Sequence, residues 1–494
     1  MSHRRTVVLG AGPAGLTAAY ELTRHQVPVT VLERDPRYVG GIARTVEHRG
    51  YRFDIGGHRF FSKNQEIEEL WTELLGDQML TCGRLSRIHY GGRYFDYPLR
   101  AANALVNLGP RETVRCVASY AKARIRPPRN ARTVEDWVVG QFGRRLFELF
   151  FKTYTEKVWG MRTDEISADW AAQRIKGLDL VKVIKSAVLP RRRPASRGEV
   201  IKTLIDEFRY PRLGPGQMWD RVAALLAGSG QPVRLGAEVL GLRHRQGRVV
   251  SAIVRDRNGA RADIDGSDFV SSLPIKELIA RLQPAAPEAV RRAAGGLKYR
   301  DFLTIALMID AENLFPDNWI YIHDPGVKVG RVQNFKNWSG AMVPDQTKTC
   351  LGLEYFCFEG DGLWSMSDPD LLRLGAAEIE QVGICARRAV FDGCVVRQAK
   401  AYPVYDDGYE ARIEVIRRYL ERSLANLHLV GRNGMHKYNN QDHSMMTGLL
   451  VARNIALGSA HDPWRVNGDA EYHEEVREDV AGTPGRLIPH RLAS

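Results

Sequence analysis

The chain has 494 residues, of which 44% are hydrophobic and 26% charged, with a formal net charge of +13. This length allows more than one hydrophobic core, so two or three closely connected domains are expected. The positive charge fits nucleic acid, an anionic membrane surface or anionic small molecules as partners. Two runs, Lys122–Arg132 and Arg191–Arg193, carry part of it and contain few aromatic residues, which favours solvated linkers over a nucleic-acid surface. Docking near anionic lipid head groups is the weaker alternative.

Cysteine usage and hydropathy bound the class of protein further. The six cysteines are scattered, with neither a CxxC pair nor a histidine at metal-site spacing, so we expect reduced thiols, a cytoplasmic protein and no metal. Arg4 and Arg5 precede an apolar stretch as in a secretory signal, but Glu21 and Arg24 interrupt that stretch. Since no segment reaches the roughly 18 apolar residues of a membrane span, we expect no transmembrane segment.

The first predicted element is a short apolar strand that runs into a glycine-rich turn. Val7–Leu9 precedes the segment Gly10-Ala11-Gly12-Pro13-Ala14-Gly15, and a second strand, Thr30–Glu33, follows one helix later. In such a βαβ unit the first glycine allows a tight turn, the second a close approach to a pyrophosphate, and the third close helix packing. Glu33 is placed to accept hydrogen bonds from a ribose 2′-OH. The pattern predicts a bound dinucleotide rather than a purely structural turn.

The rest of the chain divides by its periodicity. Apolar residues at helical spacing predict a mainly helical insertion, and alternating residues at 302–309 and 351–358 predict a second sheet. A strand at 427–432 and a helix at 446–457 return to the nucleotide fold. The expected parts are 1–63 (FAD-binding), 64–209 (helical, substrate-contacting), 210–275 (FAD-binding), 276–425 (β-sheet substrate domain), 426–468 (FAD-binding) and 469–494 (polar tail).

No second GxGxxG is present, so a single tightly held dinucleotide is expected. FAD is favoured over NAD because the chain returns to the site near its C-terminus, as suits an embedded cofactor. The fold class is therefore α/β, a Rossmann-type FAD-binding fold with an α+β substrate domain. NAD(P)H is kept open as an external reductant.

Several segments are similar to those of one flavoprotein family. GAGPAGL, GGIART, the region of Val239, the Asp268–Pro274 strand and Gly431-Arg432 resemble the amine oxidase and protoporphyrinogen oxidase class. Within that class, the segments GGHRFFS, YTEKVWG, Phe208-Arg209-Tyr210, GRVQNF and HKYNN resemble UDP-galactopyranose mutases. General flavoprotein elements specify a fold better than a reaction.

The resemblance implies site residues. Those implied to bind the cofactor are Gly10, Gly12, Pro13, Ala14, Gly15, Glu33, Arg34, Gly41, Ile42, Ala43, Arg44, Gly57, His58, Val239, Gly431, Arg432, Met446 and Thr447. Catalytic roles fall on His58, Arg331, Arg174 and Tyr438, and substrate contacts on Tyr154, Trp159, Tyr210 and Asn440.

The same resemblance implies a reaction. A mutase interconverts the pyranose and furanose forms of a nucleoside-diphosphate sugar, with N5 of the reduced flavin attacking the anomeric carbon. The implied partner is that sugar nucleotide or another anionic small molecule, and not nucleic acid. A homodimer is left open.

Several alternatives stay open beside this interpretation. Tyr154 and Trp159 fit core aromatics, Arg331 fits a sheet arginine paired with an acid, and His58 fits a hydrogen-bonded loop residue. Asp442-His443 is treated as two neighbours on an extended chain that point apart. Asn440 stands where the family has an aspartate, and the alignment of Arg174 with the second family arginine is loose. The competing reactions are hydride abstraction by an FAD-dependent oxidoreductase and, less favoured, a non-catalytic scaffold beside a glycosyltransferase.

Overall fold

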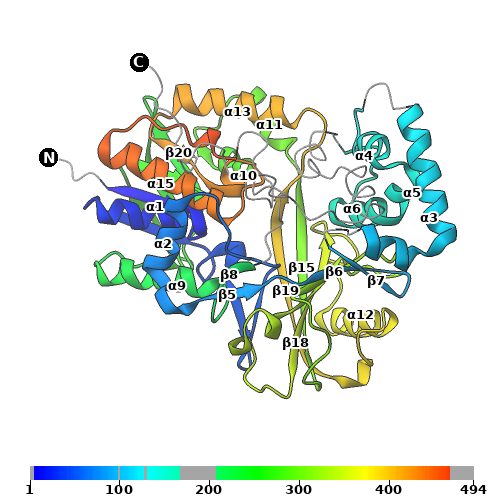
Figure 1. Cartoon of the computed structure of the whole chain (residues 1–494). Coiled ribbons are helices and arrows are strands. Elements are labelled where there is room, and N and C mark those ends of the chain that lie inside the picture. The colour runs from blue at the N-terminus through cyan, green and yellow to red at the C-terminus, as the bar shows by residue number, and fades with distance from the viewer. Residues whose placement is uncertain are drawn as a thin grey trace, which may run out of the picture.

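The computed structural model describes residues 5–97, 99, 101–126, 131–166, 168 and 207–467. Figure 1 shows three parts: a dinucleotide lobe on the left, a long-stranded sheet in the middle and below, and a helical block on the right. Strands β15 (Tyr299–Ile309) and β19 (Val390–Pro403) run from the lower sheet up toward the dinucleotide lobe.

The dinucleotide lobe is built on a parallel sheet in the order β20-β13-β1-β2-β9. Alternate residues of β1 enter two cores: Val8 joins the core under the long helices, whereas Val7 and Leu9 join the core on the opposite face. Burial on both faces explains why these strands read as continuous apolar runs. The elements are β1 (Thr6–Leu9), α1 (Pro13–Arg24), β2 (Val29–Glu33), α2 (Gln65–Leu75), α9 (Gly216–Gly228), β9 (Arg234–Leu235), β13 (Asp268–Ser271), β20 (Leu427–Leu429), α14 (Gly431–Gly434) and α15 (Gln441–Leu457).

A four-stranded sheet in the order β12-β11-β10-β14 covers the second face of this lobe. Three helices share its core with the Rossmann strands. The elements are β10 (Glu238–Arg245), β11 (Arg248–Arg255), β12 (Arg261–Asp265), β14 (Leu282–Gln283), α10 (Ile275–Ala280), α11 (Glu288–Gly295) and α13 (Tyr409–Ser423).

The seven-stranded sheet has the order β19-β15-β18-β17-β16-β6-β7. All eleven residues of β15 are buried, because one face lies under α12 (Asp368–Gln381) and the other packs on the β3–β4 hairpin side. The other strands of this sheet are β6 (Ser86–Tyr90), β7 (Arg93–Asp96), β16 (Trp319–Ile322), β17 (Arg331–Asn334) and β18 (Thr349–Cys357). The hairpin of β3 (Thr45–His48) and β4 (Tyr51–Asp54) is a separate two-stranded sheet.

The helical block contains α3 (Ala101–Ile125), α4 (Val134–Phe142), α5 (Arg144–Phe147), α6 (Thr153–Trp159) and a π-helical turn at Glu148–Lys152. The prediction of a mainly helical segment over 64–209 is wrong for its strands. β6 and β7 extend the seven-stranded sheet, and β5 (Met79–Gly83) pairs with β8 (Glu207–Pro211). Gly91-Gly92, both with positive φ, form the tight hairpin turn between β6 and β7. That glycine pair between alternating residues is a hairpin signal that the helical interpretation missed.

Elsewhere the predicted elements match the structure. The predicted strands that begin at residues 268, 302, 351 and 427 correspond to β13, β15, β18 and β20. The predicted helix at 446–457 begins five residues earlier, at Gln441, so Asp442 and His443 lie in a first helical turn and not on an extended chain. All six cysteines are free thiols. Among the residues described, no helix is long and apolar enough to cross a membrane.

Candidate functional site

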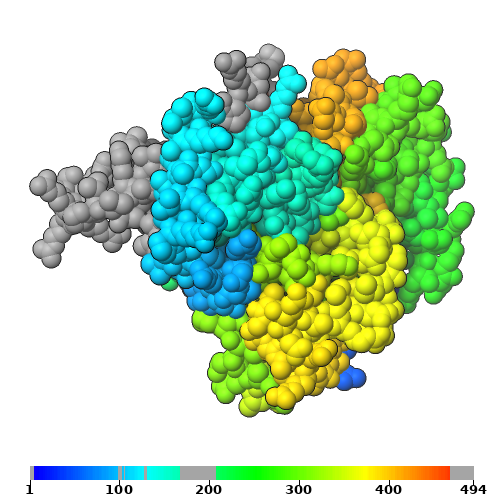
Figure 2. All heavy atoms as spheres, turned by 90° about the vertical axis from the view of Figure 1, so that its right-hand side faces the viewer, coloured from blue at the N-terminus to red at the C-terminus, as the bar shows by residue number. Residues whose placement is uncertain are grey.

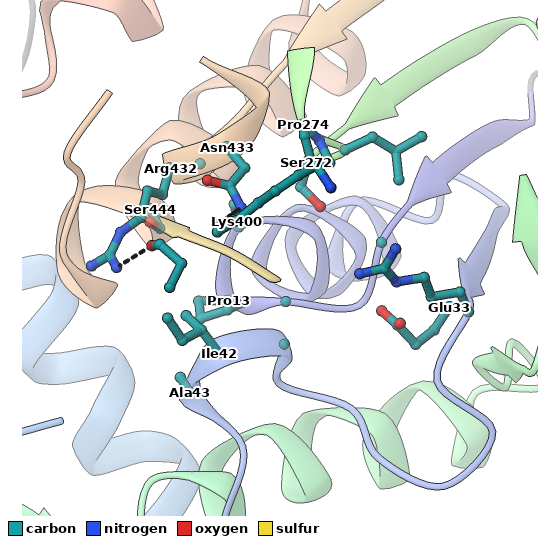
Figure 3. A pocket seen from close by; sticks show the side chains of 18 of the residues that line it. Pro13, Glu33, Ile42, Ala43, Ser272, Pro274, Lys400, Arg432, Asn433 and Ser444 are labelled. Atoms are coloured by element: carbon teal, nitrogen blue, oxygen red, sulfur yellow. Dashed lines mark hydrogen bonds between the residues drawn. The ribbon is translucent and has the colours of Figure 1, made fainter. Parts of the chain in front are cut away.

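A pocket opens at the carboxyl ends of the Rossmann strands. Figure 3 shows Pro13, Ile42 and Ala43 facing Ser272, Asn433 and Arg432 across it. The predicted cofactor residues that line it are Gly10, Gly12, Pro13, Ala14, Glu33, Arg34, Gly41, Ile42, Ala43, His58, Val239, Gly431 and Arg432. Segments far apart in the sequence thus meet where parallel α/β sheets hold their ligands.

The glycine turn is shaped for a ligand that touches backbone. A Cβ on Gly12 meets no atom within 4 Å, so the space beside this backbone is open toward the pocket. A Cβ on Gly15 falls 2.0 Å from the carbonyl oxygen of Gly10, so α1 approaches the turn as closely as only glycine allows. The amino end of α1 faces this space, and the amides there favour an anion such as a pyrophosphate. These features fit a dinucleotide.

Glu33 ends β2 with both carboxylate oxygens held in place. Oε2 accepts from the Ala11 amide at 2.8 Å, and Oε1 accepts from the Asp35 amide at 2.9 Å. Each carboxylate oxygen retains a second acceptor site. Glu33 is therefore held in one orientation with acceptor sites to spare, and its contact with a ribose hydroxyl stays a prediction.

The C-terminal return forms the far wall of the pocket. Thr447 Oγ1 accepts from the Gly431 amide at 2.9 Å and so fixes the turn, while Thr447 itself does not line the pocket. Asn440 lines the pocket and caps α15 in a reciprocal capping box with His443. Met446, also predicted to bind the cofactor, has its side chain buried in the core between α15 and α1 and does not line the pocket. Helix packing holds this methionine away from the pocket.

Three other predicted cofactor residues act from behind the wall. Arg44 Nη1 donates to the Gly41 carbonyl at 2.7 Å and to Gln398 Oε1 at 2.8 Å, which ties the Gly41–Ala43 turn to β19. Gly57 lies against Gln333, whose amide nitrogen is 2.6 Å from the position of an added Cβ. Gly15 acts through the helix contact described above. These residues support the pocket without lining it.

Four consecutive residues of β19 also line the pocket, which the sequence did not predict. In the pairing of β15 with β19, Arg300 faces Tyr402 and Phe302 faces Gln398, so Asp301 opposes a bulge of three residues. The buried carboxylate of Asp301 accepts from the Lys400 amide at 2.6 Å, and Lys400 has a φ of 54°. A bulge redirects side chains in this way. Its four pocket residues are Gln398, Ala399, Lys400 and Ala401.

Lys400 brings a cation to the pocket. Its ammonium lies 3.0 Å from Glu277, another residue of the pocket wall, and its carbonyl accepts from the Asn433 side chain at 2.7 Å. No local pattern marks these residues in the sequence. The further wall residues that prediction missed are Leu32, Ala237, Glu238, Ser272, Leu273, Pro274, Glu277, Arg281, Asn433, Asn439, Gln441 and Ser444.

His58 stands where the pocket meets the substrate-side sheet. Its Nδ1 donates to the Gly56 carbonyl at 3.0 Å, which leaves Nε2 as an acceptor. Burial, with the positive charges of Arg432 and Arg331, lowers the pKa of His58 to about 3. The imidazole is therefore neutral at physiological pH and lies in the field of both arginines.

Beyond His58 lies a group of residues that we call the arginine–tyrosine cluster: Arg331, Arg432, Tyr154, Tyr321, Tyr402 and Tyr438. Tyr402 and Tyr438 stack at 5.5 Å, and the Arg432 guanidinium lies 4.8 Å from the Tyr438 ring centre. Burial raises the pKa of Tyr402, and the charges of Arg331 and Arg432 oppose that shift. The Arg432 guanidinium also lies 5.4 Å from the Tyr402 ring centre.

Arg331 is paired with an acid on the neighbouring strand, as the alternative interpretation of this residue expected, and some of its N–H donors are still available. Its Nε and Nη2 both lie 2.6 Å from Oε2 of Glu354, a fully buried carboxylate on the neighbouring strand β18. A guanidinium has five N–H donors, so this pairing does not exhaust it. Its guanidinium carbon is 5.8 Å from the Tyr321 ring centre. Burial alone would lower the pKa of Arg331, but the Glu354 charge outweighs it and the pKa is raised.

Tyr154 is placed by α6 and by a second buried ring. It stacks on His323 at 4.9 Å and meets Tyr321 edge-on at 5.4 Å. Lys157, one turn later, donates to the carbonyls of Ile322, Asp324 and Val329 at 2.6–3.1 Å. This lysine fastens α6 to the β16–β17 connection and so fixes Tyr154 beside Arg331.

Two predicted substrate residues are core residues instead. Tyr210 is fully buried, with its hydroxyl 2.6 Å from Asp54 and its ring 5.0 Å from that of Trp338. Trp159 is buried among Val134, Val138 and Phe142. The prediction of substrate contact is wrong for both, because each ring fills the interior behind the site. Arg174 lies outside the described residues.

No group of three or more histidine, cysteine or carboxylate side chains in the described residues forms a site for a metal ion. The arrangement offers a backbone cradle for a dinucleotide and, next to it, guanidinium groups and aromatic rings that suit an anionic, partly aromatic molecule.

Comparison with known proteins agrees with this geometry. The family model for an NAD(P)-binding Rossmann-like domain matches residues 8–74. A probable UDP-galactopyranose mutase from Klebsiella pneumoniae is 25% identical over 177 residues, which is 34% of this chain and 44% of that protein. Protoporphyrinogen oxidase 2 of Arabidopsis thaliana is 39% identical over 74 residues, 15% of this chain and 14% of that protein. The chain thus matches less than half the length of these curated relatives.

Solved structures agree over almost the whole chain. Reduced UDP-galactopyranose mutase superposes with a TM-score of 0.80 at 20% identity, covering 94% of this chain and 98% of that structure. A putative protoporphyrinogen oxidase from Exiguobacterium gives a TM-score of 0.69 at 17% identity, covering 93% and 100%. The chain therefore has the fold of reduced UDP-galactopyranose mutase, which the putative protoporphyrinogen oxidase shares at lower similarity.

Proposed function

We propose that the protein is an FAD-dependent enzyme that interconverts the pyranose and furanose forms of a nucleoside-diphosphate sugar. One observation carries this proposal. The cofactor pocket ends at His58 and Arg432, and there it meets the arginine–tyrosine cluster. Two guanidinium groups at this place would bind the diphosphate of a sugar nucleotide. They would contribute nothing to binding the apolar substrate of a hydride-abstracting oxidase.

The residues divide the work as follows. Arg331 and Arg432 hold the diphosphate through charge-assisted hydrogen bonds, and Glu354 keeps the Arg331 guanidinium in one orientation. Tyr154 and the stacked pair Tyr402–Tyr438 offer ring faces and hydroxyls to the base and sugar. Neutral His58 accepts a hydrogen bond without adding charge. When bound, reduced FAD supplies a nucleophilic N5 for the anomeric carbon, with no net change in substrate oxidation state.

The test begins with the purified protein, whose cofactor is released by heat and identified by chromatography. Dithionite-reduced and oxidised samples are then incubated without oxygen with UDP-, TDP- and GDP-sugars, and products are followed by NMR. The proposal expects bound FAD and a furanose isomer of unchanged mass, formed only by reduced enzyme. Products that differ from substrate by two hydrogens, formed as the oxidised flavin bleaches, would replace it with the oxidoreductase assignment.

A further inference from the structure

The outer face of α3 carries exposed apolar side chains, and none of the residues that the structure describes buries them. The three most exposed large hydrophobic residues in the described parts of the chain all lie in α3: Val106 at 79%, Ile125 at 78% and Val114 at 67%. A kink at Gly109 and Pro110 divides α3, so Val106 belongs to its first part, and Val114 and Ile125 belong to its second. Val117, at 49%, lies one turn after Val114. Isolated exposed apolar residues are ordinary, but a group of them on one helix marks a contact surface.

The helix has a separate inner face, so the exposed residues are not a misplaced core. Cys116 and Ala123 are buried, and Cys116 shares a core with Phe95 and Phe150. Ser119 Oγ accepts from the Arg145 amide at 3.0 Å, and Gly143 comes close to the backbone of Ser119 and Tyr120. Positions 116, 119, 120 and 123 therefore face the helical block.

Opposite them, positions 114, 117, 118, 121 and 125 face outward and are all apolar. Their spacing of three, four and seven or eight residues defines one stripe of a helix. Figure 1 shows α3 at the outer edge of the helical block, away from the dinucleotide lobe, and Figure 2 shows the block from the side that this helix borders.

The charges around the stripe are almost all positive. Between positions 111 and 126 the basic residues are Arg111, Arg115, Lys122, Arg124 and Arg126, and each is exposed. Glu112 is the one acidic residue in that interval, and it already pairs with Arg115 and Arg145. A helix face with an apolar stripe and basic flanks is the chemistry of a surface that lies in a lipid head-group layer.

We propose that α3 docks this protein on anionic lipid bilayers, with Val114, Val117 and Ile125 entering the head-group region and Lys122, Arg124 and Arg126 contacting lipid phosphates. This inference is independent of the proposed catalytic function. A second protein copy would bring the same positive charge to the interface and so is disfavoured on electrostatic grounds.

The test measures sedimentation of the full-length protein with vesicles of phosphatidylcholine alone and with 30% phosphatidylglycerol. The proposal expects binding to the anionic vesicles that weakens with salt, and little binding to the neutral ones. Lys122→Glu with Arg126→Glu is expected to lower the partition coefficient about tenfold or more. The matched control is Arg245→Glu with Arg261→Glu, an equal charge change at exposed ends of β10 and β12, which should bind as the wild type does.

A third variant, Val114→Ser with Ile125→Ser, separates insertion of apolar side chains into the head-group layer from electrostatic attraction to anionic lipids. It should bind at low salt and detach at lower salt than the wild type, because its charge is unchanged. Equal losses in the two charge-reversal variants would mean that the net charge of the protein and not α3 drives binding, and would overturn the proposal. Failure to bind anionic vesicles would overturn it as well, as would a wild-type dimer that Val114→Ser with Ile125→Ser converts to monomer.

Discussion

The two halves of the candidate site are made in different ways. The dinucleotide cradle consists mainly of backbone, in a turn whose residues are neighbours in sequence and whose geometry depends on missing side chains. The arginine–tyrosine cluster consists of side chains from α6, from α14 and the segment after it, and from β16, β17 and β19 of the seven-stranded sheet. A site that binds its ligand through backbone groups can be found from a local sequence motif. A site that binds through side chains of separate strands depends on how those strands are paired, which no local motif shows.

The largest expected effect comes from filling the close contact in the cradle. Gly15→Ala places a methyl group 2.0 Å from the Gly10 carbonyl oxygen, so α1 must move away from the turn. We expect a loss of about 3 kcal/mol in unfolding free energy and loss of bound cofactor after gel filtration. Gly228→Ala, in α9 with no atom within 4 Å of the new Cβ, is the control and should be neutral or slightly stabilising. Cofactor retained by Gly15→Ala would contradict the cradle geometry.

In the arginine–tyrosine cluster, we expect activity to depend on the geometry of the hydrogen-bond donors of Arg331. Arg331→Lys keeps the charge but removes the planar fork, so under the proposed function kcat/KM falls about a hundredfold while bound FAD is retained. Arg87→Lys is the matched control, because Arg87 makes a similar double contact with buried Asp317 on the same sheet. It should lower stability and leave kcat/KM unchanged. Equal kinetic losses in both variants would show that Arg331 acts only through the sheet.

Acid sensitivity offers a thermodynamic test of His58. Its folded pKa of about 3 lies below the ordinary value of 6.5, so below pH 6.5 the unfolded chain binds a proton that the native state rejects. The contribution of His58 to the free energy of unfolding is therefore fully present above pH 6.5. It falls by about 1.4 kcal/mol for each pH unit between pH 6.5 and pH 3. Urea unfolding of the apoprotein between pH 6 and 4 should therefore show a shallower pH slope for His58→Gln. Parallel slopes would place His58 in a wetter environment than the structure shows.

The smallest expected effect tests whether Tyr210 belongs to the core or to the substrate site. Tyr210→Phe removes the donor to Asp54, whose pKa burial raises to about 8, and should cost about 1 kcal/mol of unfolding free energy. Thermal unfolding measures that loss, and sugar-nucleotide titration should find unchanged affinity. A variant with native stability and weakened substrate binding would restore Tyr210 to the substrate site.

The sequence predicted what depends on local rules. Gly12, Glu33 and Gly431 line the pocket, and the sequence could single them out because a turn, a strand end and a second turn each have a recognisable pattern. Lys400 was missed because its position depends on Asp301, 99 residues away, which holds the bulge. Tyr210 and Trp159 were misassigned because a motif shows which residues recur in a family and not which way a ring points.

The bulge in β19 gives the cofactor influence over strands that it does not touch. A ligand that binds only the native pocket adds RT ln(1 + [L]/Kd) to the free energy of every unfolding event that destroys the pocket. Because β19 forms the pocket wall at residues 398–401 and pairs with β15 along most of its length, opening of the β15 edge is such an event. Amide protons of β15 should therefore exchange more slowly in holoprotein than in apoprotein. Their exchange rates would report whether the cofactor is bound in the dinucleotide lobe.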